Sequence, residues 1–341
     1  MNKKIYVLMI IILLLTACSN FKTNNDNISN NSQPIKKSSF LLDTIVTVQI
    51  YDSDDESILN EAIELIKYYE LIFSRSNEKS ELYRLNHGFL AHEGLNYTIS
   101  DELADVLSYG IKYGNLSNGY FDITIAPILS LWDFKAENPV LPSDDKLNEA
   151  IPLVGYKNMT LVGNNLTFKN QAIEIDLGGI AKGYIADRIK DYLLEKSVES
   201  AMINLGGNVL CLGSKPDGSP FNIGIQMPYA DRNETIAAME ISDMSVVSSG
   251  IYERFITIND KSYHHILNPK TGYPFENNLI SVSIISPYSV DGDGLSTTTF
   301  ALGLEKGMEL IESLPDTYAI FITDDYKLHY TKGFEDAINI K

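Results

Sequence analysis

The sequence has very little cysteine, tryptophan or histidine. Its 341 residues include two cysteines, one tryptophan and five histidines. One cysteine, Cys18, directly follows an apolar N-terminal run, which leaves Cys211 alone in the rest of the chain and excludes an internal disulfide there. A chain of this length can bury a core large enough to fold without a disulfide. The histidines are not accompanied by a cysteine cluster, which argues against a tetrahedral zinc site.

Basic residues are also scarce. The sequence has 27 lysines and arginines against 45 acidic residues, a formal net charge of −18. Such a charge argues against a nucleic-acid partner. It also makes the protein a poor general binder of phosphates, so we expect any nucleotide site to need a metal cation. The sequence contains no evident internal repeat.

The chain begins with a short positive segment and one apolar run. Lys3 and Lys4 precede residues 5–15, a run of 11 residues. This is shorter than the ~20 residues that a membrane-spanning helix needs, and it is typical of a signal peptide. No second hydrophobic span follows. Without Lys3 and Lys4 the net charge becomes −20.

The run ends in Leu15-Thr16-Ala17-Cys18, which resembles the lipobox of bacterial lipoproteins. The resemblance implies that residues 1–17 are a signal peptide and that Cys18 becomes a lipidated N-terminus. The protein would then be anchored in the cell membrane and face its extracytoplasmic side. An ordinary signal peptide with an incidental cysteine is the alternative. Residues 18–39 are polar and predict a flexible tether, and residues 40–341 predict the folded domain.

Hydrophobic periodicity predicts a mixture of strands and helices in the folded part. Apolar residues at helical spacing predict helices over 56–72, 183–194, 294–302 and 305–313, and Ser100 is expected to begin another. Predicted strands cover 40–51, 201–205, 221–226, 236–241, 254–258, 279–285 and 319–323, with a hairpin over 161–175. Because the strands and helices do not alternate regularly, the pattern favours an α+β fold over a doubly wound sheet.

The richest local feature is residues 174–183, where a predicted strand ends, two glycines follow and a helix begins with Lys182 in its first turn. A helix N-terminus with a nearby lysine can bind an anion. The glycine spacing matches neither a Walker loop nor a Rossmann fingerprint. Residues 204–208 and 248–250 are further turns rich in small residues, so the three together predict a cleft lined by backbone. The alternative for each is a tight turn without a ligand.

Two adjacent histidines, His264 and His265, precede a loop rich in proline and glycine. Neighbours in an extended segment point in opposite directions, so one imidazole can face a cleft while the other faces the core or solvent. A neutral histidine is a suitable general base near pH 7. The alternative is a structural histidine in a loop.

Residues 291–299 combine carboxylates and hydroxyls where a helix is expected to begin. Asp293 and Thr297 are four residues apart, so they lie on one face of that helix and can bind one hard cation. Oxygen ligands alone favour Mg²⁺ or Ca²⁺ over zinc or iron. Asp293 could instead serve only as a helix N-cap.

The order of these motifs resembles that of the ApbE family, the FAD:protein FMN transferases, over about residues 40–335. The matching stretches are 42–44, 73–86, 119–127 with Leu131-Trp132, 176–183, 204–208, 248–250 with Tyr252 and Arg254, 265–272 and 293–297. The resemblance implies an α+β, T-fold-like architecture of mixed antiparallel sheets with flanking helices, which binds FAD in a cleft.

The resemblance also implies a reaction and a set of site residues. FAD would be the substrate, Mg²⁺ the cofactor, and the FMN acceptor a protein with a Ser/Thr-Gly-Ala-Ser/Thr-like motif. The metal would be held by Asp293, Thr297 and the carbonyl of Gly179, and His265 would deprotonate the acceptor hydroxyl. FAD contacts would fall on Leu42, Tyr120, Phe121, Asp122, Asp176, Lys182 and Leu267.

The chain departs from the family pattern at three positions. Leu42 stands where a methionine is frequent, and Ser296 where some members have a carboxylate. Ser76 stands where an aromatic residue often stacks on the flavin, which leaves stacking to Tyr252 or another aromatic. Two other functions stay open on these residues: hydrolysis of FAD to FMN and AMP, and binding of flavin by a lipoprotein without turnover.

Overall fold

The structure, a computed structural model, describes residues 33–231 and 234–340. The expected signal peptide, Cys18 and most of the expected tether lie outside the described residues. The first strand begins at Ile35, so the expected end of the tether at residue 39 is wrong, because residues 35–39 already pair within a sheet. No helix within the described ranges is both long and apolar enough to span a membrane.

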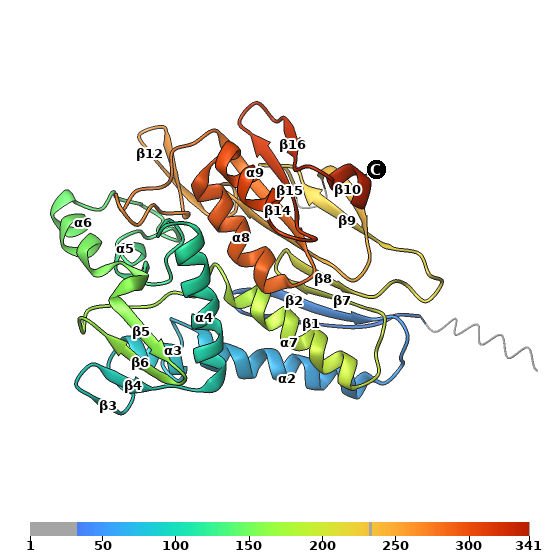
Figure 1. Cartoon of the computed structure of the whole chain (residues 1–341), viewed down its shortest axis with the longest axis horizontal. Coiled ribbons are helices and arrows are strands. Elements are labelled where there is room, and N and C mark those ends of the chain that lie inside the picture. The colour runs from blue at the N-terminus through green and yellow to red at the C-terminus, as the bar shows by residue number, and fades with distance from the viewer. Residues whose placement is uncertain (1–32, 232–233, 341) are drawn as a thin grey trace, which may run out of the picture. The chain divides into compact units, whose positions relative to one another are not determined.

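The main sheet has eight strands in the order β1-β2-β7-β8-β11-β14-β15-β16, and every neighbouring pair is antiparallel (Figure 1). Its strands are β1 (Ile35–Leu41), β2 (Thr44–Ile50), β7 (Ala201–Leu205), β8 (Asn208–Leu212), β11 (Ser245–Gly250), β14 (Leu279–Ser286), β15 (Tyr318–Thr323) and β16 (Leu328–Tyr330).

Three smaller antiparallel sheets accompany it. One contains β9 (Phe221–Gln226), β10 (Thr235–Ile241) and β17 (Asn339–Ile340), and a second is the hairpin of β12 (Phe255–Ile258) and β13 (Lys261–His264). The third contains β3 (His92–Glu93), β4 (Asn96–Thr98), β5 (Met159–Val162) and β6 (Asn165–Phe168).

Helices pack on one face of the main sheet, where α2, α7 and α8 lie against the strands (Figure 1). The described helices are α2 (Glu56–Phe73), α3 (Glu81–Asn86), α4 (Asp101–Leu116), α5 (Ala126–Leu129), α6 (Asp144–Ala150), α7 (Ala181–Glu195), α8 (Ser289–Leu302), α9 (Leu304–Glu312) and α10 (Phe334–Ala337). Two short 3₁₀ turns cover Ile151–Leu153 and Tyr156–Asn158.

The burial of the strands follows from this layering. In β2 every second residue is buried, since that end of the sheet is covered on one face only. All eight residues of β14 are buried, because the helices cover one of its faces and the sheet of β9 and β10 contributes to a second core cluster on the other. That second cluster contains Cys211, which is fully buried.

The expected α+β class with antiparallel sheets is confirmed, and the main differences are local. The expected strand 40–51 is the end of one strand and the whole of the next, because the alternating pattern continues through a two-residue turn in which Leu42 and Asp43 have φ values of 55° and 58°. Residues 248–250, expected as a turn, form the end of β11. Helix α8 begins at Ser289 rather than at residue 294, since two glycines at positions 292 and 294 obscured its first turns.

One buried amide holds the segment that leads to the glycine loop. Asn86 is 8% exposed, and its Nδ2 donates to the Ile175 carbonyl at 2.8 Å while its Oδ1 accepts from the Ile175 N–H at 2.8 Å. This pair of bonds replaces a strand neighbour for Ile175. The position of the following loop therefore depends on Asn86.

Replacing Asn86 with alanine should lower the free energy of unfolding by about 2–5 kcal/mol, because both backbone groups of Ile175 lose their partners in a buried site. Urea unfolding followed by circular dichroism measures this change. Asn96→Ala is the matched control, since Asn96 is exposed and its amide bonds lie at the surface; its effect should stay within about 0.5 kcal/mol. Equal effects of the two variants would contradict the role given to Asn86.

Candidate active site

The glycine loop at residues 176–180 leads into α7 and is held by hydrogen bonds within the loop and to neighbouring segments. The Asp176 N–H donates to the Ile123 carbonyl at 2.7 Å, and its Oδ1 accepts from the Gly178 N–H at 2.8 Å. Arg75 Nε lies 3.3 Å from Asp176 Oδ2. Lys182 Nζ donates back to the Gly178 carbonyl at 3.3 Å, which places its charge beside the loop. The predicted arrangement of loop, helix and lysine is therefore present, although the residues before the loop are not in a strand.

Helix α7 has no side-chain cap of its own at its N-terminus. The Gly183 N–H instead donates to Asp293 Oδ2 of α8 at 2.9 Å. A Cβ at Gly183 would lie 2.3 Å from the Ser289 carbonyl oxygen and 2.8 Å from the Asp293 Cβ, so only glycine permits this approach of the two helices. Asp293 lies in the second turn of α8, so it is not the N-cap of that helix, and it instead accepts from a first-turn N–H of α7.

A chain of hydroxyls fixes the orientation of Thr297. Ser296 Oγ donates to the Asp293 carbonyl at 2.9 Å, so it accepts from Ser249 Oγ, which is 2.8 Å away. The Ser249 hydrogen is then committed, and the contact of 3.1 Å between Ser249 Oγ and Thr297 Oγ1 has Thr297 as donor. The lone pairs of Thr297 stay available for a ligand. Sequence reasoning missed the role of Ser249 because residues 248–250 read as a turn.

These oxygens fit a hard cation. A Cβ at Gly179 would lie 3.6 Å from Thr297 Oγ1, which places this glycine against the threonine. Asp293 is 5% exposed, and its Oδ1 accepts no hydrogen bond from a described residue. The described residues hold no group of three or more His, Cys, Asp or Glu side chains able to bind a metal. One carboxylate with neutral oxygens is, however, a set that suits Mg²⁺, which usually completes its shell with water and substrate phosphates.

The two histidines have different surroundings. His264 Nε2 donates to the Phe275 carbonyl at 3.0 Å, and its Nδ1 accepts from the Ile266 N–H at 3.3 Å, so both of its nitrogens are engaged. His265 Nδ1 donates to the Arg254 carbonyl at 3.1 Å, and this tautomer leaves Nε2 as a free acceptor. The rings contact different residues, Phe300 for His264 and Phe134 for His265. The prediction that they face opposite sides agrees with this geometry.

Burial lowers the pKa of His265 to about 4, and the positive charges of Arg254, His264 and Lys182 act in the same direction. The imidazole is therefore neutral at neutral pH and can accept a proton at Nε2. The Phe275 ring, whose backbone carbonyl accepts from His264, packs against Tyr120. The next residue, Phe121, lies against Gly179, so the histidines and the glycine loop lie in the same region of the described chain.

Three of the residues expected to contact FAD, Tyr120, Phe121 and Leu267, pack against different neighbours. Phe121 is buried, and its Cε2 would lie 3.2 Å from a Cβ at Gly179, so it lies beneath the glycine loop. The Tyr120 ring packs edge-on against Phe275 and lies 3.9 Å below Lys270 Nζ. Leu267 is buried in a cluster with Trp132.

Two of these residues have their polar groups engaged within the protein. The Asp122 carboxylate accepts from the Thr124 N–H at 2.9 Å, the Thr124 hydroxyl at 2.6 Å and the Tyr156 N–H at 2.7 Å. Burial raises the pKa of Asp122, and these bonds oppose that change. The Leu42 N–H donates to Glu70 Oε1 at 2.7 Å. Their contacts with FAD stay predictions.

The two positions considered for flavin stacking, Ser76 and Tyr252, have different surroundings. Ser76 is exposed on a polar turn, where its N–H donates to Ser74 Oγ. Tyr252 packs against the core between the two sheets, its ring is 5.9 Å from that of Tyr229, and burial raises its pKa to about 12.

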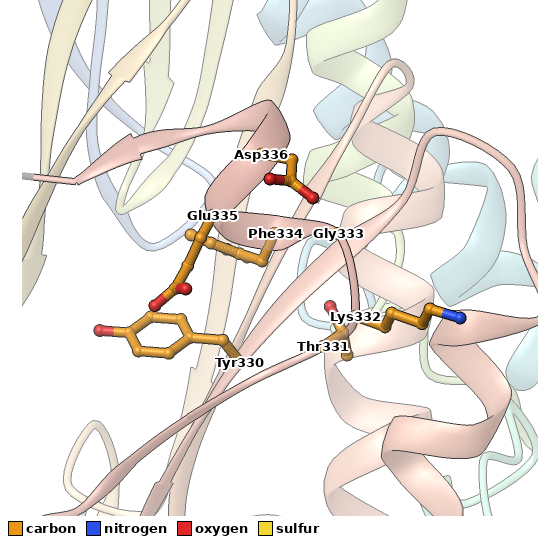
Figure 2. Close-up of a pocket in the computed structure, with 7 residues that line it drawn as sticks. All are labelled: Tyr330, Thr331, Lys332, Gly333, Phe334, Glu335 and Asp336. Carbon is orange, nitrogen blue, oxygen red and sulfur yellow. The ribbon is translucent and has the colours of Figure 1, made fainter.

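A surface hollow of about 330 Å³ lies elsewhere. It is lined by one continuous segment, residues 330–336, which runs from the end of β16 into α10, and Figure 2 shows Glu335 beside the Tyr330 ring. None of the residues predicted for the site lines it. The contacts around α7 and α8, rather than this hollow, therefore define the candidate site.

Comparisons with known proteins identify relatives that match most of the chain. The model of the ApbE family matches residues 42–322. A FAD:protein FMN transferase of Klebsiella pneumoniae is 34% identical over 288 residues, 84% of this chain and 88% of that protein. One of Treponema pallidum is 29% identical over 324 residues, 89% of this chain and 88% of that protein. The flavin transferase ApbE of Vibrio cholerae superposes with a TM-score of 0.79 at 27% identity, covering 89% of this chain and 99% of that structure.

Proposed function

The chain belongs to the ApbE family, and on this basis we propose that it is a Mg²⁺-dependent FAD:protein FMN transferase. The reaction would attach FMN to a threonine, or a serine, of an acceptor protein through a phosphoester bond and release AMP. The acceptor would be an exported or membrane redox protein with a Ser/Thr-Gly-Ala-Ser/Thr-like motif.

The observation that carries the proposal is the meeting of α7 and α8. Gly183 of one helix binds Asp293 of the other at 2.9 Å, and Gly179 lies against Thr297. Lys182, in the first turn of α7, donates to the Gly178 carbonyl at 3.3 Å and supplies positive charge at the glycine loop. Cation ligands, an anion-binding helix end and a neutral base are the groups that phosphoryl transfer needs.

Each group has a defined task in the reaction. Asp293, Thr297 and the Gly179 carbonyl would hold Mg²⁺, which when bound reduces the charge repulsion at a phosphate. Lys182 and the N-terminus of α7 orient the pyrophosphate. His265 accepts the proton of the acceptor hydroxyl at Nε2. The hydroxyl oxygen forms a bond to the FMN-side phosphorus as the bond between that phosphorus and the bridging oxygen breaks, and AMP leaves with that oxygen.

Incubation with FAD, Mg²⁺ and an acceptor protein carrying the motif tests the function. Intact-mass analysis should show FMN on the acceptor, with equimolar AMP. EDTA should stop the reaction, and Asp293→Asn should reduce it by at least about 100-fold, because the variant keeps the size of the side chain but loses the charge that the cation needs.

The two alternative functions give different products in the same assay. Free FMN and AMP with an unmodified acceptor would indicate a hydrolase that uses water. FAD bound without any product would indicate a flavin-binding protein. Full transfer in EDTA would remove the cation from the proposal.

His265→Ala should lower kcat for FMN transfer by about two to four orders of magnitude and leave the Kd for FAD nearly unchanged, since a group that only accepts a proton contributes little to ground-state binding. His264→Ala is the matched control, because both nitrogens of His264 are engaged by backbone groups. It should cost stability but keep transfer by the folded protein. Loss of transfer in His264→Ala with normal transfer in His265→Ala would show that His265 is not the base.

We also propose that the protein is anchored in the cell membrane by lipid on Cys18 and faces the extracytoplasmic side. The support is the sequence Leu15-Thr16-Ala17-Cys18 after the apolar run. Cys18→Ala should therefore leave an unprocessed precursor and yield no lipidated protein. Gel mobility measures the processing, and labelling with a fatty-acid analogue measures the lipidation. Normal processing and labelling of the variant would contradict the anchor.

A further inference from the structure

Helix α8 begins in the core without a cap from its own N-terminal residues. Its N-cap residue is Tyr288, which makes no side-chain capping bond, and Ser289 and Val290 are buried. The N–H groups of Ser289 and Val290 both donate, at 2.8 Å each, to the carboxylate of Asp187. Asp187 belongs to α7, so the start of α8 is capped from the neighbouring helix.

This cap forms the second of two links between the helices. Gly183 and Asp187 are one turn apart on α7, and Ser289 and Asp293 are one turn apart on α8. Gly183 binds Asp293, and Asp187 binds the N–H groups of Ser289 and Val290, so the helices run antiparallel. In each link a carboxylate of one helix accepts from backbone N–H of the other. Two links separated by one turn define the position of α8 along α7, which a single link would not.

The position matters for the cation ligands. A shift of α8 by one residue corresponds to about 1.5 Å along its axis and about 100° of rotation. It would carry Asp293 away from Gly183 and Thr297 away from Gly179.

The buried charge of Asp187 does not by itself stabilise the fold. Asp187 is 5% exposed, and burial raises its pKa to about 6, while the two N–H bonds and the charges of Arg188 and Lys190 oppose that change. A buried side chain that is ionised at neutral pH lowers the stability of the fold relative to a neutral one. The two directional hydrogen bonds that Asp187 accepts from α8 give this buried carboxylate a role, because they fix the position of that helix.

We propose that Asp187 is a positioning residue for the cation site, which fixes α8 against α7 so that Asp293 and Thr297 bind a divalent cation together. The inference rests on the proposed Mg²⁺ site and deepens it. Within the described chain, none of the hydrogen bonds of Asp187 involves an expected cation ligand.

Binding of Mn²⁺ in the presence of FAD, measured by electron paramagnetic resonance, tests the proposal in Asp187→Ala and Asp187→Asn. Both variants should bind Mn²⁺ about 10–100-fold more weakly, the range typical for loss of a group that orients a metal ligand. In the transfer assay the Mg²⁺ concentration for half-maximal rate should rise by a similar factor, with kcat at saturating Mg²⁺ within about threefold of the unmodified protein. Asp187→Asn keeps one acceptor and serves if the alanine variant does not fold.

Leu193→Ala is the control for a general loss of stability. Leu193 is fully buried on α7, within the main core and away from the start of α8. It should lower the melting temperature without weakening Mn²⁺ binding. Unchanged Mn²⁺ affinity in both Asp187 variants, or equal weakening in Leu193→Ala, would overturn the positioning role. Equal affinity of the unmodified protein and Asp293→Asn would instead overturn the cation site itself.

Discussion

The approach of α7 to α8 at Gly183 is the constraint on which the site depends. The missing side chain lets the Gly183 N–H reach Asp293, where any Cβ would collide with the Ser289 carbonyl. This contact orients one carboxylate oxygen toward the helix and leaves the other for a ligand. Since α8 packs on β11 and β14, the ligand geometry is anchored to the centre of the main sheet rather than to a surface loop.

The site also explains how a protein of net charge −18 can handle a nucleotide. Repulsion from the acidic surface has to be offset locally, and the structure offers few positive groups for that purpose. Lys182 lies at the glycine loop, Arg75 pairs with Asp176, and Lys270 lies over Tyr120. A cation bound at Asp293 and Thr297 would add to them. The metal expected from composition stays a prediction, and Asp293 and Thr297 are the oxygen ligands proposed to bind it.

The sequence was sufficient for the fold class, for most helices and for the motifs that surround α7 and α8. Spacing alone placed Asp293 and Thr297 on one helix face and separated the environments of His264 and His265. It failed where the deciding contact is distant in sequence. Small residues are typical of turns, but they also suit a strand that packs closely against a helix, so residues 248–250 were predicted as a turn and form the end of β11 instead. Ser249 contacts Thr297 only in the folded protein. Likewise, the alternating pattern across Leu42 hid a tight turn at positive φ.

The burial of Cys211 between the two sheets has a practical consequence for chemistry on this protein. The thiol is fully buried, and burial raises its pKa to about 12, so almost none is present as the reactive thiolate at neutral pH. The part of the chain that the structure describes therefore has no accessible thiol, which makes it resistant to oxidation and to adventitious crosslinking. A cysteine introduced on its surface would consequently be the preferred target for a spectroscopic label, with Cys211 left in place.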